Sequence, residues 1–138
     1  MTFLVDANVL SELTREAPDP RVVRWLREHE RDLVVSPIVL GEIEYGILLL
    51  PSGKRRARLQ HWFSQGIQRI HSLELDQAVA AVWARMLVKL KKAGAAMPIK
   101  DSLIAATALA HQLTVATRNT RDFRNAGVAL VNPFVVSS

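Results

Sequence analysis

The chain has 138 residues, of which 49% are hydrophobic, and this composition predicts a single folded domain over residues 1–138. It contains no cysteine, which excludes disulfides and thiolate metal sites, and it has neither a long apolar span nor a signal-peptide pattern, so we expect a cytoplasmic protein without a membrane anchor. The formal net charge of +5 favours an anionic partner, either nucleic acid or an acidic protein.

The N-terminal part of the chain predicts two strands with helices after the first of them. Residues 2–5 form an apolar run that ends at Asp6, and a helical pattern follows. Asp6 either caps that helix or acts as a carboxylate at the carboxyl end of a central strand. Asp19 and Pro20 give the cap and first-turn pattern of a second helix, which leads to a second strand at residues 33–35.

The next predicted helix begins after Ser36 and covers residues 37–49. Glu42 lies at the border of its apolar face, where a carboxylate is unfavourable unless it is paired or binds a cation. Glu42 therefore either reaches solvent or a nearby arginine, or belongs to a functional site. Residues 54–63 predict a basic amphipathic helix, and its cations at 54–58 are either a solvated face or a contact surface for RNA or an acidic partner.

The last third of the chain places one carboxylate before a helix and another after a strand. A short strand at residues 69–73 comes first, and Asp76 is then expected to cap a helix that runs through residue 92. Asp101 then opens a helix, which it can also cap. The apolar run at residues 113–116 predicts a buried strand, and Asp122 follows it in a polar turn.

A final strand at residues 128–131 completes an alternation of strands and helices, which is typical of an α/β fold with a parallel sheet covered on both faces. Such folds carry their chemistry at the carboxyl edge of the sheet, where Asp6, Glu42, Asp101 and Asp122 could converge. Acids packed together repel unless a cation or protons lie among them. Oxygen ligands favour Mg²⁺ or Mn²⁺, which can activate water to cleave a phosphodiester.

A basic rim beside such a metal site would attract a nucleic-acid backbone, and the candidates for it are Lys100, Arg118 and Arg121. Other chemistries lack their motifs, because the sequence has no phosphate-binding loop, dinucleotide-binding glycine motif or nucleophilic-serine elbow. An aspartyl-phosphate phosphatase would need a second acid where this chain has Asn8. The four histidines are scattered, and we do not expect them to be ligands.

Three segments resemble the PIN-domain ribonucleases, and in particular the VapC toxins of bacterial toxin–antitoxin pairs, including the FitB-like branch. These segments are LVDANVLSEL (4–13), SPIVLGEIEYGI (36–47) and PIKDSLIAATALAHQLTVATRNTRDF (98–123), and the ending VNPF (131–134) agrees with them. The resemblance implies a three-layer α/β/α sandwich whose parallel sheet has about five short strands. It also implies Mg²⁺- or Mn²⁺-dependent hydrolysis of RNA phosphodiester bonds by metal-activated water.

The resemblance further implies a homodimer and a cognate VapB-like antitoxin that neutralises it. The tail of the antitoxin would cover the active site of the toxin. The toxin would meet operator DNA only through this antitoxin. Asp6 matches the first metal-binding acid of the family, Glu42 its helix acid and Asp101 its third acid, so that Asp6 and Asp101 are the expected metal ligands. The fourth family acid falls where this chain has Asn119, and Asp122 lies three residues later. Either residue could complete the catalytic set.

Asn8 and Thr117 match polar positions beside the acids, where they are expected to orient ligands or water. The departure at Asn119 keeps a second interpretation open, in which the chain is a catalytically weak PIN-like binding module within a DNA-binding toxin–antitoxin complex. A third interpretation, a DNA flap-type nuclease, is less favoured because the chain lacks the extra elements that hold a duplex. The identity of the RNA and the number of metal ions stay open.

Overall fold

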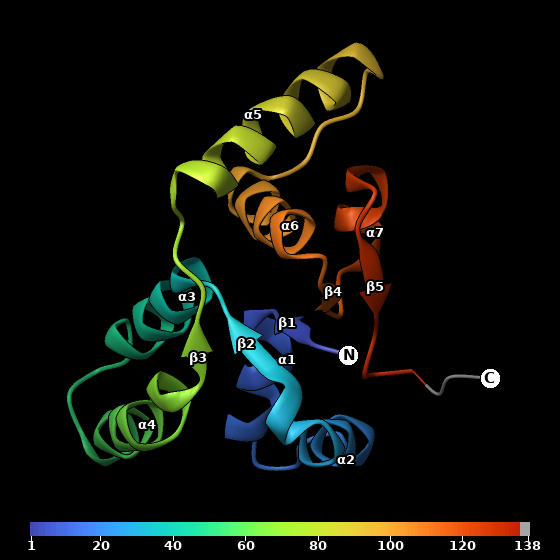
Figure 1. The fold of residues 1–138 in the computed structure, drawn as a ribbon. Helices are drawn as coiled ribbons and strands as arrows, with labels where there is room; N and C mark the ends of the chain where they lie inside the picture. Colours follow the sequence, from blue (N-terminus) through green and yellow to red (C-terminus); the bar gives the residue numbers. More distant parts are fainter. Residues whose placement is uncertain (136–138) are drawn as a thin grey trace.

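Five short strands form one parallel sheet at the centre of the computed structural model, which describes residues 1–135 (Figure 1). Every neighbouring pair of strands is parallel, and their order across the sheet is β3-β2-β1-β4-β5. The strands are β1 Phe3–Val5, β2 Leu33–Val35, β3 His71–Ser72, β4 Thr114–Ala116 and β5 Ala129–Val131. The predicted α/β fold with a parallel sheet of short strands is thus confirmed.

The strand order reverses between β1 and β4, and this reversal fixes where a ligand can bind. From β1 the chain builds the sheet outward through β2 to β3, and it then returns to the other side of β1 to add β4 and β5. In an open α/β sheet the crevice at such a switch point lies beyond the carboxyl ends of the strands. Asp6 and Thr117 are the first residues after β1 and β4, so both lie at this crevice.

Seven helices connect the strands within the described residues, and short 3₁₀ turns extend several of them. The helices are α1 Ala7–Ser11, α2 Pro20–Glu28, α3 Pro37–Leu48, α4 Lys54–Gln65, α5 Gln77–Lys92, α6 Ile99–His111 and α7 Thr120–Phe123. The 3₁₀ turns are Glu12–Thr14, Glu30–Asp32, Ile67–Arg69 and Arg124–Ala126. Figure 1 shows α5 beside α6 at one end of the molecule, while α3 and α4 lie toward the β3 side.

Four helices begin at the residues whose side chains predicted a cap. Asp6 accepts a hydrogen bond from the backbone N–H of Ala7, and the caps of α2, α3 and α5 are built in the same way by Asp19, Ser36 and Asp76. These side chains satisfy N–H groups that a helix cannot bond internally. The boundaries of α1, α2, α3 and α5 therefore follow from local sequence alone.

Two local predictions near the end of the chain are wrong. α6 begins at Ile99, after Pro98, so Asp101 lies inside the first turn and its side chain does not cap the helix. A carboxylate there still benefits from the positive end of the helix dipole, and its oxygens are not committed to capping. Asp122 was placed in a polar turn, but it belongs to the short helix α7, which Phe123 anchors in the core.

The core covers both faces of the sheet. All three residues of β1 are buried, and because successive strand side chains point to opposite faces, both faces of the central strand must be covered. α6 packs with small side chains, since Ala105, Ala106 and Ala108 are fully buried. This close approach brings the first turn of α6 to the carboxyl edge of the sheet. No helix in residues 1–135 is long and apolar enough to cross a bilayer.

Candidate active site

Asp6 is held at the sheet edge by hydrogen bonds to both of its carboxylate oxygens. Oδ1 accepts from the Ala7 backbone N–H at 2.8 Å, while Oδ2 accepts from the Thr117 hydroxyl at 2.8 Å and the Asn8 amide at 3.3 Å. Only 3% of the residue is exposed. The two interpretations of Asp6 are therefore compatible, because one oxygen caps α1 while the other faces the crevice between β1 and β4.

The loops that follow β1 and β4 are joined by this network. The Thr117 hydroxyl donates to Asp6 and accepts from the backbone N–H of Asn119 at 3.0 Å. Asn8 lies within 3.4 Å of the same hydroxyl, and its side-chain oxygen accepts from the backbone N–H of Arg118 at 3.1 Å. Asn8 and Thr117, both predicted to lie beside the acids, are thus brought together, and they fix the orientation of the Asp6 carboxylate.

Asp101 is buried near Asp6 without comparable support. Burial raises the pKa of its carboxyl group to about 6, and the negative charges of Asp6, Asp122 and Glu42 act in the same direction. Burial also raises the pKa of Asp6, but there hydrogen bonds from Thr117 and Ala7 oppose the shift. At Asp101 the charge of Lys100 is the one opposing influence within residues 1–135. The ionised form of Asp101 is therefore held in an unfavourable environment that a cation would relieve.

Glu42 reaches the same edge from α3 and pairs with a lysine rather than with solvent or an arginine. The ammonium of Lys100 donates to Glu42 Oε1 at 2.7 Å. The other carboxylate oxygen, Oε2, is buried and has no hydrogen-bond partner within residues 1–135. A buried acceptor without a partner is uncommon in folded proteins, and a functional site is one recognised reason for it.

The structure distinguishes Asn119 from Asp122, the two candidates for the fourth position. Asn119 lines the groove that contains Asp6, Glu42 and Lys100. Asp122 does not line that groove and is exposed on α7, although its negative charge still acts on Asp101. Asn119 thus lines the same groove as Asp6 and Glu42, whereas Asp122 acts on Asp101 through its charge.

The three cations predicted to form a basic rim lie in different places. Lys100 lies among the acids themselves. The guanidinium of Arg118 lies 4.7 Å from the centre of the Phe134 ring, and its charge acts on Asp19. Arg121 is exposed on α7. Lys100 is therefore the one member of this group that contacts a predicted site carboxylate.

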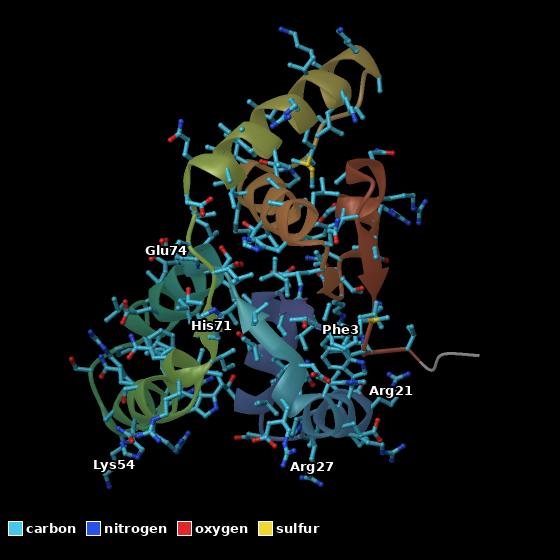
Figure 2. The ribbon with its side chains drawn as sticks, viewed as in Figure 1. Phe3, Arg21, Arg27, Lys54, His71 and Glu74 are labelled. Carbon is cyan, nitrogen blue, oxygen red and sulfur yellow. The ribbon has the colours of Figure 1, made fainter. Side chains whose placement is uncertain are left out.

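Asp6 and Glu42 open into a groove of about 410 Å³ that is also lined by α3 and α4, whereas Asp101 does not line this groove. Arg55, Leu59 and Trp62 project from α4 into it, opposite the acidic end. Leu59 and Trp62 were not predicted as site residues, whereas Arg55 belongs to the basic segment 54–58, for which a contact with RNA or an acidic partner stayed open. Their spacing of four and then three positions puts them on one helix face, and that pattern could have revealed a shared surface. Lys54, one residue earlier, lies at the outer edge of the molecule (Figure 2).

The donor atoms at the acidic end suit a hard divalent cation. No three His, Cys, Asp or Glu side chains in residues 1–135 are grouped closely enough to hold one ion among them. Mg²⁺ nevertheless binds proteins through only one or two carboxylates and keeps several waters. Asp6 and Asp101 could supply the two carboxylates, and both the raised pKa of Asp101 and the unpartnered oxygen of Glu42 fit a cation at this place.

Comparison with known proteins agrees with this architecture. Residues 3–129 match the profile of the PIN domain. The chain is 39% identical over 136 residues to toxin FitB of Neisseria gonorrhoeae, with 96% of this chain and 98% of FitB covered. It is 33% identical over 138 residues to a VapC ribonuclease of Sinorhizobium fredii, with 96% of this chain and 97% of that protein covered.

Solved structures give the same result. A structure of FitAB bound to a DNA fragment superposes with a TM-score of 0.93 at 37% identity, and 99% of each chain is covered. FitAcB from Neisseria gonorrhoeae superposes with a TM-score of 0.92 at 38% identity, covering 98% of this chain and 100% of that one. The chain belongs to the PIN-domain family, on the branch that contains the FitB and VapC toxins.

Proposed function

We propose that this chain is a Mg²⁺- or Mn²⁺-dependent endoribonuclease and the toxin of a toxin–antitoxin pair. The observation that carries the proposal is the pair of buried carboxylates, Asp6 and Asp101, at the switch point of the sheet. Two like charges in one buried place are unfavourable without a cation. The relatives named as a toxin and as a ribonuclease support the same activity.

Asp6 and Asp101 are the residues that would hold the ion, with Glu42 beside them. A bound divalent ion lowers the pKa of water to make a nucleophile and stabilises negative charge on a phosphate. Thr117 and Asn8 keep the Asp6 carboxylate in one orientation, so little reorganisation is needed when substrate binds. Asn119 and Asp122 supply polar and charged groups on the β4 side of the site.

The partners follow from the same relationship. Solved neighbours are complexes of FitB with FitA and, at lower identity, of VapC with VapB, several of them bound to DNA. We infer that this chain forms a homodimer, binds a cognate VapB-like antitoxin, and meets operator DNA only through that antitoxin. The groove beside the acids would admit an antitoxin segment, which would exclude RNA from the site.

A second candidate function is a catalytically weak binding module in a DNA-binding complex. Two observations favour it, namely the amide of Asn119 where an acid is expected, and the lack of a three-acid metal cluster within residues 1–135. Such a module would bind its antitoxin and, through it, DNA, without cleaving RNA under any metal condition.

The proposal is tested by RNA cleavage with purified protein in Mn²⁺ or in EDTA, together with growth arrest in cells. Asp6→Asn should abolish both cleavage and arrest, because it removes one of the two buried carboxylates. Asp32→Asn is the matched control, since Asp32 is an exposed acid just before β2 and so lies at the opposite edge of the sheet. An Asp6→Asn variant as toxic as the parent would refute the mechanism, and inactive parent protein that binds its antitoxin tightly would favour the binding module.

A further inference from the structure

Lys100 provides the positive charge within the acidic end of the groove. Its ammonium lies 2.7 Å from Glu42 Oε1, and the residue is adjacent in sequence to Asp101 on the first turn of α6. A lysine amine is protonated near neutral pH. An ammonium therefore lies beside the carboxylates around which the proposed function places a metal cation.

We propose that Lys100 is an internal cation that competes with the divalent ion for Glu42, and that it thereby sets the metal concentration at which the site fills. This inference rests on the proposed metal-dependent function. It concerns the regulation of the site. Before the ion binds, Lys100 pairs with the carboxylates, and it becomes available to the substrate backbone only when the ion binds.

The geometry of the Lys100–Glu42 salt bridge indicates that a divalent ion could replace the ammonium. Lys100 satisfies Oε1 of Glu42 but leaves Oε2 buried without a partner in the described part of the chain. An ammonium is a compact point charge on a flexible stem, and 46% of this side chain is exposed. Lys100 can therefore swing toward solvent without disturbing the core, whereas Glu42 stays fixed at the edge of the buried face of α3.

Electrostatics gives the direction of the effect. An ammonium beside the carboxylates repels an incoming divalent cation and occupies an oxygen that could contact it. Removing that charge should strengthen metal binding even though it removes a salt bridge. Once displaced, Lys100 lies free in the groove, where its charge is available to a substrate phosphate. The competition thus couples the release of Lys100 to occupancy of the metal site.

Calorimetric titration with MnCl₂ tests the competition without measuring activity. Lys100→Met keeps the length of the side chain but removes its charge, and we expect it to bind Mn²⁺ about three- to tenfold more tightly than the parent. Lys100→Arg keeps the charge and should stay within about twofold of the parent, as should Lys92→Met at the far end of α5 (Figure 1). Unchanged or weaker binding by Lys100→Met would overturn the inference.

Thermal unfolding separates competition from a purely structural role. In EDTA, Lys100→Met should melt below the parent, because the carboxylates lose their only nearby opposing charge in the described residues. Saturating Mn²⁺ should close this gap, and a gap that persists in Mn²⁺ would show that Lys100 acts only as a structural partner. If the parent neither binds Mn²⁺ nor cleaves RNA, both proposals fail. If the parent does both, but Lys100→Met binds Mn²⁺ with the same affinity as the parent, only the inference about Lys100 fails.

Discussion

The two halves of the acidic site are built differently. On the strand side, Asp6 has hydrogen bonds to both oxygens, and Asn8 and Thr117 join the loops after β1 and β4 around it. On the helix side, Asp101 has a pKa raised to about 6, and Glu42 keeps one buried oxygen without a partner within residues 1–135. On the strand side the carboxylate oxygens have hydrogen-bond partners, whereas on the helix side negative charge is buried without enough partners.

This difference separates residues that position the site from residues that await a ligand. Hydrogen-bonded networks are stable without any cation, and they keep a carboxylate in one orientation. Buried charges without such bonds destabilise the fold until a counter-charge arrives. Removing a carboxylate should therefore lower stability on the strand side and raise it on the helix side. It should abolish cleavage in both halves.

The largest effect is expected on cleavage. Asp101→Asn should reduce the rate of RNA cleavage in Mn²⁺ by about a thousandfold, since the metal's stabilisation of the transition state is worth several kcal/mol. The measurement is the initial rate on a labelled RNA, with Asp32→Asn as control. Cleavage within a few per cent of the parent rate would mean that the helix side does not belong to the active site.

Stability should fall when the strand side is damaged. Asp6→Ala removes the cap of α1 and the acceptor of the Thr117 hydroxyl, and we expect a loss of about 1–2 kcal/mol in the free energy of unfolding. Urea unfolding in EDTA would measure it. If Asp6→Ala were more stable than the parent, removing the buried charge would gain more free energy than losing the hydrogen bonds of Asp6 costs. The contrast between the two halves would then disappear.

The helix side should instead show its strain in the dependence of stability on pH. The pKa of Asp101 in the folded protein, about 6, lies above its ordinary value of 3.8, so the folded state binds the proton more tightly than the unfolded chain. Stability in EDTA should therefore rise as the pH falls through 6 toward 4, by about 1 kcal/mol or more.

Asp101→Asn is the reference for that measurement. It should be more stable than the parent at pH 7, and the difference between the two proteins should shrink as the pH falls. Titrating groups that do not act on Asp101, such as Asp19 with its pKa of about 2, cancel in the difference. A difference that is constant between pH 7 and pH 4 would contradict the strained environment of Asp101.

The smallest effect is expected far from the acids, on the α4 wall of the groove. Arg55 lines the groove and Arg56 lies next to it, so charge reversal of both residues to Glu should weaken binding of RNA or of an acidic antitoxin segment. The loss should be greatest at low salt, because exposed charges are screened as ionic strength rises. A charge-reversed variant that binds as tightly as the parent at every salt concentration would make this surface a simple solvated face.

Local sequence was enough to predict most elements of the fold, whereas Asn8 and Thr117 on the strand side were indicated by the family resemblance. Asp6, Asp19, Ser36 and Asp76 cap their helices as predicted, because a cap depends on residues that are adjacent in sequence. The apolar runs likewise gave the strands to within two residues at each end. The order of the strands in the sheet is not local, because it depends on the chain crossing back from β3 to place β4 beside β1. This crossing is what brings Thr117 to Asp6.

The helix side was harder to predict because neither the local sequence nor the family resemblance indicated which residues contact one another there. Lys100 and Glu42 are 58 positions apart, and nothing local to either residue indicates the pair. Asp122 was placed in a turn, but burial of Phe123 holds that segment as a helix and leaves Asp122 exposed. Arg118 was assigned to the rim, yet its guanidinium lies over Phe134, another contact that only the folded chain creates.

We infer that the two halves of the site meet around a divalent cation. An anomalous difference map from crystals of the protein grown with Mn²⁺ tests this most directly. We expect one strong peak in contact with the carboxylates of Asp6 and Asp101, with the ammonium of Lys100 withdrawn from Glu42. A map without a peak at these carboxylates, at Mn²⁺ concentrations that support RNA cleavage, would contradict it.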